Sequence, residues 1–190
     1  VLVRQQDGPG ARRSAPPRVS VIMTIYNAGS FLPEAIDTKL ATGEFDTLTL
    51  VHNETSTGGM NPLEEIAALK AKYPGVMFIV DSVSSMTAVP LPFDQLGIDV
   101  LLAGTQKAWA LPPGLAVFIC SEAALARAEK AKDRGYYFDF LEFQNNAEKN
   151  MTPSTPSIAH INGLSHKLDE FFAEGLDNRY ARHRTTNQMT

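Results

Sequence analysis

The sequence has little cysteine and no long apolar run. Cys120 is the only cysteine among 190 residues, so no disulfide bond can close within the chain. Cysteine used this sparingly fits a reducing compartment. No stretch reaches the roughly 18 apolar residues that a membrane-spanning helix needs, and the first residues lack the apolar core of a secretion signal. We therefore expect a cytoplasmic protein without a membrane partner.

A large charge excess of either sign is also lacking. The chain carries 17 basic and 21 acidic side chains, which gives a net charge of −4. Surfaces that bind nucleic acid or anionic lipid are usually strongly basic, so neither partner is expected. Residues 1–17 combine three arginines with several glycines and prolines and show no hydrophobic period. We therefore predict that they form a mobile arm. A basic arm can bind nucleic acid, but such an arm would also be expected to carry aromatic side chains, so a solvated tail is favoured.

Three short apolar runs, each followed by polar residues, organise the middle of the chain. They lie at residues 48–51, 77–80 and 100–103. Continuous apolar runs of this length between turn residues are typical of strands that are buried on both faces. Residues 62–73 separate the first two runs and have apolar residues at helical spacing. A strand, a helix and a strand joined by short loops predict parallel strands. Their polar ends then meet at one edge of the sheet, where α/β proteins bind ligands.

Residues at that edge offer the functional groups needed to bind pyridoxal phosphate. Asp81 follows the second run, Lys107 follows the third, and Thr55 and Gln106 add a hydroxyl and an amide. An amine can form a Schiff base with the cofactor's aldehyde, a carboxylate can keep the ring nitrogen protonated, and the donors can bind the phosphate or the ring hydroxyl. Residue type alone leaves alternatives open. A lysine is usually a solvated surface charge, and an aspartate at a strand end is usually a cap or turn residue.

Four motifs over residues 39–184 narrow these alternatives. In chain order they are HNETSTG, VDSVSS, GIDVLLAGTQKAWALPPGLAVF and TPSTPSIAHINGL. Together they resemble the large domain of class V aminotransferases of the serine:pyruvate and alanine:glyoxylate type, which are fold-type I pyridoxal phosphate enzymes. The resemblance implies amino transfer between a small amino acid, such as alanine or serine, and a 2-oxo acid, such as glyoxylate or pyruvate. It also implies pyridoxal 5'-phosphate as the cofactor and a homodimer.

The same resemblance assigns roles to individual residues. Lys107 would be the Schiff-base lysine and Asp81 the partner of the pyridinium nitrogen, and both would be catalytic. Five further residues would contact the cofactor: Val83 on the ring face, Thr55 at the ring hydroxyl, Gln106 at the phosphate, and Thr152 and Thr155 at the phosphate of a neighbouring subunit. No metal site is expected, because no set of histidine, cysteine and carboxylate side chains has the spacing of metal ligands.

A second resemblance concerns residues 18–38. The sequence PRVSVIMTIYNAGSFLPEAID is similar to the first strand, turn and helix of family 2 glycosyltransferases. The acidic residues that hold a divalent metal and the sugar diphosphate in that family do not follow, which disfavours a nucleotide-sugar reaction. We therefore predict a chimeric chain, with the glycosyltransferase-like segment at 18–38, the aminotransferase-like segment at 39–184 and a tail at 185–190. Alternatively, the first of these segments simply adds a strand to the sheet.

Parts of the aminotransferase pattern are missing from the sequence. The family's glycine-rich phosphate loop and aromatic stacking residue belong upstream of HNETSTG, where residues 18–38 stand instead. The family also has a substrate-binding arginine in a C-terminal domain, whereas Arg179, Arg182 and Arg184 are interpreted as part of a helical tail. An incomplete chain with impaired activity is therefore expected. A non-catalytic α/β domain or a cofactor-binding remnant is the alternative.

The predicted fold is a three-layer α/β sandwich, an incomplete fold-type I large domain. Its sheet has about five strands, mostly parallel, and includes an N-terminal strand at residues 19–25. Residues 115–120 form one antiparallel strand, because the connection before them is too short for a crossover helix. The aromatic residues between 136 and 143 are expected to cover the sheet or to pack against a partner. Covering helices are expected at residues 31–40, 62–73, 121–132 and 157–176.

Overall fold

The computed structural model describes residues 2–4, 19–20 and 31–189. The chain divides into two compact units. The first unit comprises the chain up to Ser84 together with Pro92–Leu101, and the second comprises Ser85–Leu91 and the chain after Leu101.

The first unit is built on the neighbouring strands β2-β1-β3-β6. Strands β3 and β6 pair in parallel, from Thr47 opposite Met77 to Val51 opposite Asp81. Strand β1 is antiparallel to both β2 and β3, and a hairpin of β4 and β5 follows β3. The strands span Leu2–Arg4 (β1), Val19–Ser20 (β2), Phe45–Val51 (β3), Asn53–Glu54 (β4), Gly59–Met60 (β5) and Met77–Asp81 (β6).

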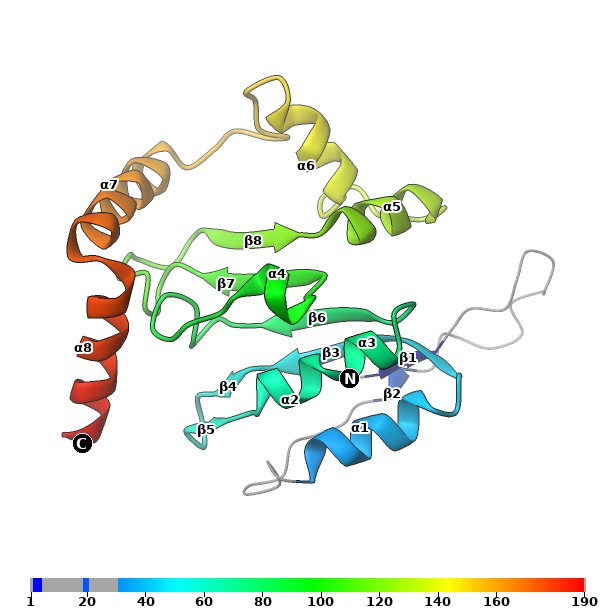
Figure 1. Ribbon diagram of the computed structural model, residues 1–190. Coiled ribbons are helices and arrows are strands. Elements are labelled where there is room, and N and C mark those ends of the chain that lie inside the picture. The colour runs from blue at the N-terminus through cyan, green and yellow to red at the C-terminus, as the bar shows by residue number, and fades with distance from the viewer. Residues whose placement is uncertain (1, 5–18, 21–30, 190) are drawn as a thin grey trace. The chain divides into compact units, whose positions relative to one another are not determined.

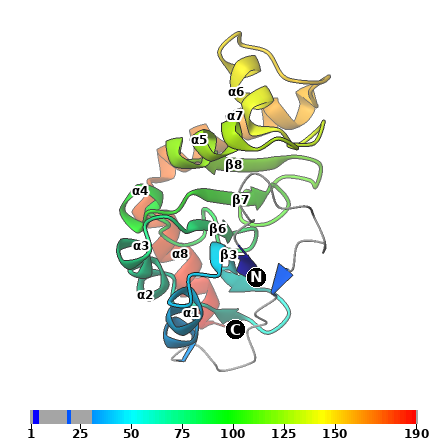
Figure 2. The ribbon, with the colours of Figure 1, turned by 90° about the vertical axis from the view of Figure 1, so that its right-hand side faces the viewer.

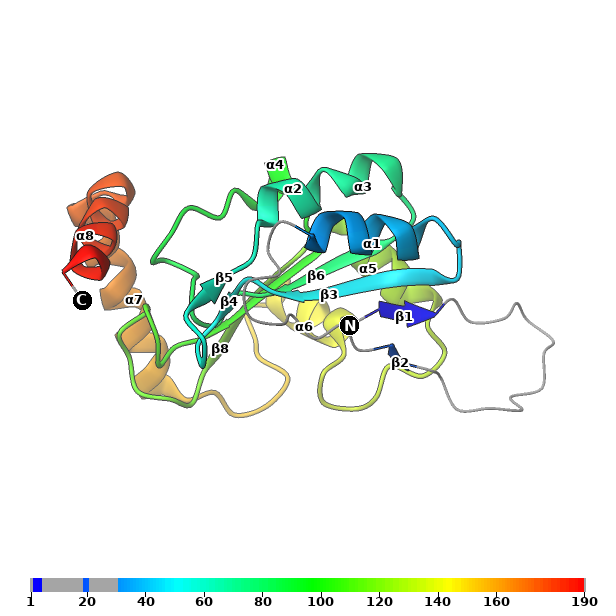
Figure 3. The same cartoon turned by 90° about the horizontal axis from the view of Figure 1, so that it is seen from below.

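Helices α1, α2 and α3 cover one face of β3 and β6. Figure 1 shows them in front of the two strands, and Figure 2 and Figure 3 show all three on the same side. Burial alternates along β6, where Phe78 and Val80 are buried and their neighbours are half-buried. Ile36 and Ile66 are buried almost completely, so the core lies between this helical layer and the sheet. The helices span Leu32–Leu40 (α1), Leu63–Ala67 (α2) and Leu69–Lys72 (α3), and Phe93–Leu96 (α4) belongs to the same unit.

A buried ion pair connects Lys70 of α3 to Asp99, whose carboxylate also binds the backbone of β6. Asp99 is 3 % exposed. Its Oδ2 accepts hydrogen bonds from Lys70 Nζ at 2.5 Å and from the backbone N–H of Phe78 at 2.8 Å. Lys70 Nζ also donates to the carbonyl oxygen of Val76 at 2.6 Å. The carboxylate therefore satisfies a buried amide and a partly buried ammonium at once, which is what makes a buried charge tolerable.

Replacement of Asp99 by alanine is expected to destabilise the first unit by about 3 kcal/mol, because it leaves the buried amide of Phe78 without its acceptor and the ammonium of Lys70 without its opposite charge. The free energy of unfolding in urea measures the change. Lys72→Ala is the matched control, since Lys72 lies in the same helix but forms its ion pair with Asp37 at the surface. That variant should leave stability unchanged within error. Equal effects of the two substitutions would contradict the prediction.

The second unit begins within β7 (Val100–Gly104) and continues through β8 (Ala116–Cys120). Figure 1 shows β8 running opposite to β7, as the short connection predicts. The polypeptide bends between α7 and α8 at Gly175, whose φ of +82° lies in the left-handed region that favours glycine. The helices span Glu122–Lys130 (α5), Phe140–Ala147 (α6), Ile158–Glu174 (α7) and Leu176–Gln188 (α8).

Most of the predicted elements are found close to their expected bounds. The strand predicted from the apolar run at residues 77–80 matches β6, and the predicted helix at residues 31–40 corresponds to α1. The helix expected over residues 62–73 is divided by a turn at Ala68 into α2 and α3. The helix expected over residues 157–176 ends at Glu174, because Gly175 breaks the helical backbone.

Two regions differ from the sequence-based expectation. Residues 2–4 of the predicted mobile arm form β1, which pairs with β3. Helix α6, within the aromatic region, was not expected; Asp139 caps it, with its side chain accepting a hydrogen bond from the N–H of Leu141 at 3.0 Å. The strand expected at residues 19–25 includes Val19–Ser20 of β2, and its other residues lie outside the described part of the chain.

Candidate functional site

Asp81 lies at the carboxyl end of β6, in the first unit. It is the last residue of the strand, and its carbonyl oxygen accepts a hydrogen bond from the backbone N–H of His52 at 2.8 Å. Its side chain is oriented by the next turn, because Oδ1 accepts a hydrogen bond from the N–H of Val83 at 2.9 Å. The carboxylate is therefore held at the sheet edge predicted to bind a ligand.

The polar segments that follow β3 and β6 meet at this edge. Thr55 and Ser84 share a hydrogen bond between their hydroxyl oxygens, 2.5 Å apart. His52 is buried, and burial lowers the pKa of its imidazole below the ordinary value, partly opposed by the charge of Glu64. A buried neutral histidine next to β3 favours a structural role over a role as a surface proton donor. Within the first unit, the predicted convergence of the two polar segments is confirmed.

Lys107 and Gln106 lie in the turn after β7, in the second unit. Both side chains are exposed, while Thr105 before them is completely buried. The Thr105 hydroxyl donates to the carbonyl oxygen of Pro112 at 2.9 Å, and the Leu111 N–H donates to the carbonyl oxygen of Thr105 at 3.1 Å. These hydrogen bonds close the turn, so the backbone that carries Lys107 is fixed although the side chain itself reaches solvent.

Gly104 has a steric role beside this turn. A Cβ atom on Gly104 would lie 2.4 Å from Oε1 of Gln106 and 3.0 Å from its Nε2, which is closer than real contacts allow. The amide side chain of Gln106 thus lies directly over the glycine. Any larger residue at this position would displace the amide that the family resemblance assigns to the cofactor's phosphate.

Thr152 and Thr155 line a mostly apolar pocket of about 650 Å³ within the second unit. Phe118 of β8, which also lines the pocket, contacts two other aromatic rings. Its ring centroid lies 5.5 Å from that of Phe140 and 5.4 Å from that of Phe143. Cys120 also lines the pocket, and burial raises the pKa of its thiol to about 11. The thiol is therefore protonated at neutral pH and unreactive, in agreement with a structural cysteine.

The structure brings together some of the predicted site residues. Asp81, Val83 and Thr55 belong to the first unit, and Lys107, Gln106, Thr152 and Thr155 belong to the second. Within the first unit, the N–H of Val83 donates to Asp81 Oδ1, and Thr55 is hydrogen-bonded to Ser84, three positions after Asp81. The convergence of Asp81 with Lys107 stays a prediction.

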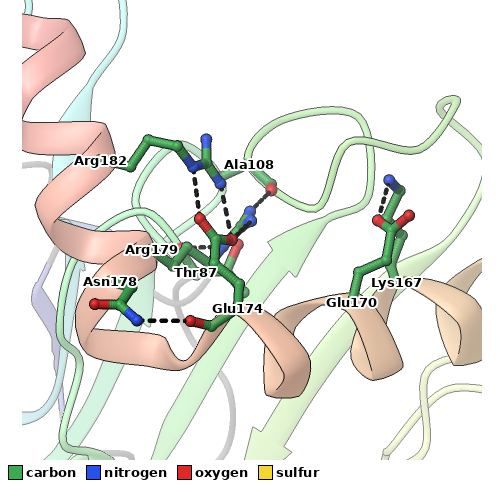
Figure 4. Close-up of polar contacts among 8 residues, drawn as sticks. All are labelled: Thr87, Ala108, Lys167, Glu170, Glu174, Asn178, Arg179 and Arg182. Atoms are coloured by element: carbon green, nitrogen blue, oxygen red, sulfur yellow. Dashed lines mark hydrogen bonds and ion pairs between the residues drawn. The ribbon is translucent and has the colours of Figure 1, made fainter.

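Arg179 is a residue of this region that the sequence pattern did not reveal. The sequence suggests a helical tail, whereas the structure buries Arg179 to 5 % exposure. Figure 4 shows its guanidinium directed at backbone carbonyl groups of Thr87 and Ala108. The available signal in the sequence is Glu174, an acidic residue just before the helix break at Gly175, which can pair with a basic residue of the following helix.

Two further classes of site find no support in the described ranges. Among residues 2–4, 19–20 and 31–189, no group of three or more histidine, cysteine, aspartate or glutamate side chains could hold a metal ion. None of the helices within these ranges has the length and apolar character needed to cross a membrane.

The sequence of this chain is similar to that of one protein family and to those of several named proteins. The aminotransferase class V family matches residues 14–190. An L-aspartate–glyoxylate aminotransferase of Paracoccus denitrificans is 37 % identical over 145 residues, covering 74 % of this chain and 36 % of the relative. A serine–glyoxylate aminotransferase of Arabidopsis thaliana is 35 % identical over 178 residues, covering 90 % of this chain and 44 % of the relative. The chain thus spans less than half the length of either relative.

A solved structure agrees with these matches. The crystal structure of an alanine–glyoxylate aminotransferase from Nostoc sp. superimposes with a TM-score of 0.75 at 28 % identity, covering 82 % of this chain and 42 % of that one. The predicted α/β fold with a mostly parallel sheet, part of a fold-type I large domain, is thereby confirmed. The family match extends over almost the whole sequence, and the chain belongs to the class V aminotransferase family.

Proposed function

We propose that this chain forms the pyridoxal phosphate-binding part of an aminotransferase. The reaction would move an amino group between a small amino acid, such as alanine or serine, and a 2-oxo acid, such as glyoxylate or pyruvate. The observation that carries the proposal is the family match over residues 14–190, which includes Asp81 at the end of β6 and Lys107 in the turn after β7. The relatives from Paracoccus and Arabidopsis are both named for reactions with glyoxylate, which supports a small oxo acid.

The chemistry of the available groups fits the cofactor. Asp81 uses Oδ1 for the N–H of Val83, and among the described residues Oδ2 accepts no hydrogen bond. That oxygen is therefore available for a protonated ring nitrogen. Lys107 forms no ion pair within the described residues, so its amine is available to an aldehyde. Thr55 and Gln106 offer uncharged donors suited to the ring hydroxyl and the phosphate.

The mechanism assigns a separate task to each side chain. Bound pyridoxal phosphate supplies an aldehyde that takes up the amino group and a ring that accepts electrons. The amine of Lys107 would hold the cofactor through its aldehyde, and as a free amine it would move a proton to and from the substrate's α-carbon, first as a base and then as an acid. The carboxylate of Asp81 would hold the proton on the ring nitrogen, Val83 would contact the ring face, and Thr55 and Gln106 would bind the ring hydroxyl and the phosphate.

A second copy of this chain is proposed as the partner. The pocket lined by Thr152 and Thr155 is mostly apolar. Nearby in the sequence, Tyr136, Tyr137 and Phe138 are 97 %, 62 % and 79 % exposed. Exposed aromatic side chains next to an apolar pocket are typical of interfaces between subunits, and most soluble oligomers are symmetric homo-oligomers. In the homodimer, Thr152 and Thr155 would reach the neighbouring subunit's phosphate. The cytoplasmic location stays a prediction.

The segment boundaries remain part of the proposal. The glycosyltransferase-like origin of residues 18–38 stays a prediction, and so does the chimeric chain. The family match begins at residue 14 and includes these residues. Residues 21–30, which make up about half of the resemblance, lie outside the described part of the chain. The boundary at residue 39 is therefore proposed from sequence pattern alone.

Trapping of the cofactor tests the proposed function. The chain is incubated with pyridoxal phosphate and reduced with borohydride, and the modified peptide is identified by mass spectrometry. We expect one modified site, Lys107, and amino transfer from alanine or serine to glyoxylate or pyruvate. Attachment at Lys107 without transfer would favour the cofactor-binding remnant instead. Attachment at no lysine, or equally at many surface lysines, would refute the proposal.

A further inference from the structure

The turn that carries Lys107 is held by a buried arginine from another element of the second unit. Arg179 lies near the start of α8. Its Nη2 donates a hydrogen bond to the carbonyl oxygen of Ala108 at 2.5 Å, and its Nε donates to the carbonyl oxygen of Thr87 at 2.9 Å. Figure 4 shows both hydrogen bonds leaving the same guanidinium. Because Ala108 directly follows Lys107, this arginine fixes the backbone next to the reactive lysine.

The backbone held by these hydrogen bonds is unusual. Thr87 has a φ of 70° and Ala110 has a φ of 56°, values in the left-handed region that residues other than glycine rarely adopt. Such conformations persist where the surrounding structure restrains them, and they are concentrated at functional sites. The carbonyl of Thr87 is held by Arg179, and the N–H of Ala110 donates to the carbonyl oxygen of Lys107 at 2.9 Å. Arg179 thus supplies restraints to two strained segments at once.

The guanidinium is itself held in place by packing and charge. It lies over the ring of Phe171, with Cζ 3.7 Å from the ring centroid, and Phe171 packs against Trp109 at 5.7 Å between centroids. Burial lowers the pKa of Arg179 from its ordinary value, and the carboxylate of Glu174, 3.4 Å from Nη1, opposes this shift. An arginine nevertheless stays charged at neutral pH, so its hydrogen bonds to the two carbonyls are charge-assisted.

We infer that Arg179 is a positioning residue: by binding the carbonyl oxygens of Ala108 and Thr87, it fixes the turn from which Lys107 reacts with an aldehyde. The inference rests on the proposed function, in which Lys107 binds pyridoxal phosphate. Arg179 acts through the backbone and not through contact with the reacting atoms. The planar fork of the guanidinium is essential to this role, because a lysine ammonium is a compact charge that cannot match the geometry of two separate carbonyls.

The experiment compares the unsubstituted chain with Arg179→Lys and with a matched control, Arg182→Lys. Arg182 lies on the same helix, and its guanidinium binds Glu174 at 2.6 and 3.0 Å from an exposed position. The first measurement is hydrogen exchange without cofactor, in the peptide that contains the hydrogen-bonded amides of Ala110 and Leu111. The second measurement is the rate at which pyridoxal phosphate becomes attached to Lys107, trapped by borohydride at successive times.

Arg179→Lys should speed hydrogen exchange in the turn about 10-fold. It should slow attachment of pyridoxal phosphate at Lys107 by about 10- to 100-fold, because even a small displacement of a reacting group lowers its rate of reaction by this much. Exchange in α5 should not change, and Arg182→Lys should leave both measurements unchanged. The inference would be overturned by unchanged exchange in the turn, by an unchanged attachment rate, or by faster exchange throughout the unit, which would indicate general loosening. Absence of attachment in the unsubstituted chain would instead overturn the proposed function.

Discussion

Lys107→Ala is expected to abolish attachment of pyridoxal phosphate and to lower the rate of amino transfer by about 10³-fold or more. The substitution removes both the nucleophile that anchors the aldehyde and the base that moves the proton, each of which contributes orders of magnitude to such reactions. The fold should be unaffected. The side chain of Lys107 is exposed and forms no hydrogen bond or ion pair with the described residues. Lys107 supports the turn only through its backbone carbonyl oxygen, which the alanine variant keeps.

Lys107→Arg is the control that separates charge from chemistry. Arginine keeps the positive charge at this position, but it does not lose its proton in proteins and cannot attack the aldehyde as a neutral amine. We expect it to be as inactive as the alanine variant in initial-rate assays, with an unchanged circular dichroism spectrum. Substantial transfer by either variant would mean that another lysine carries the reaction. The proposed role of Lys107 would then have to be abandoned.

The strands around the predicted site could be identified from sequence because their pattern is local. Apolar runs ending in polar clusters predict β6 almost to the residue and the end of β3, which begins three residues before its apolar run, and the intervening helical pattern predicts their parallel pairing. Parallel pairing in turn places both polar segments at one edge, which the hydrogen bond between Thr55 and Ser84 confirms. Each step needs only the periodicity of a strand or helix and the geometry of a crossover connection.

One feature that sequence reasoning missed, the burial of Arg179, depends on contacts between distant residues. Arg179 is 92 positions from Thr87 and 71 from Ala108, its two carbonyl partners, so no local pattern distinguishes it from the exposed arginines nearby. The break at Ala68 also has no local signal, because alanine favours a continuous helix. Helix α6 begins in an aromatic region with little helix preference, and its signal is the cap at Asp139.

Asp81→Asn is expected to leave attachment at Lys107 intact but to slow amino transfer by about 10²-fold, the cost of removing one charge that stabilises the reacting state. The amide has the same shape as the carboxylate, and its oxygen can still accept the hydrogen bond that Asp81 Oδ1 receives from the N–H of Val83. The turn after β6 should therefore persist. An uncharged amide cannot hold a proton on the ring nitrogen, so the ring accepts electrons less readily.

Comparison with Asp81→Ala separates these two contributions. Alanine removes the charge and also the acceptor for Val83 N–H, so it should lower transfer at least as much as asparagine and additionally weaken cofactor binding through a disordered turn. Single-turnover rates and dissociation constants for pyridoxal phosphate distinguish the two effects. If Asp81→Asn transferred amino groups at the rate of the unsubstituted chain, the carboxylate would be only a turn residue. The charge on the ring nitrogen would then have to be stabilised from elsewhere.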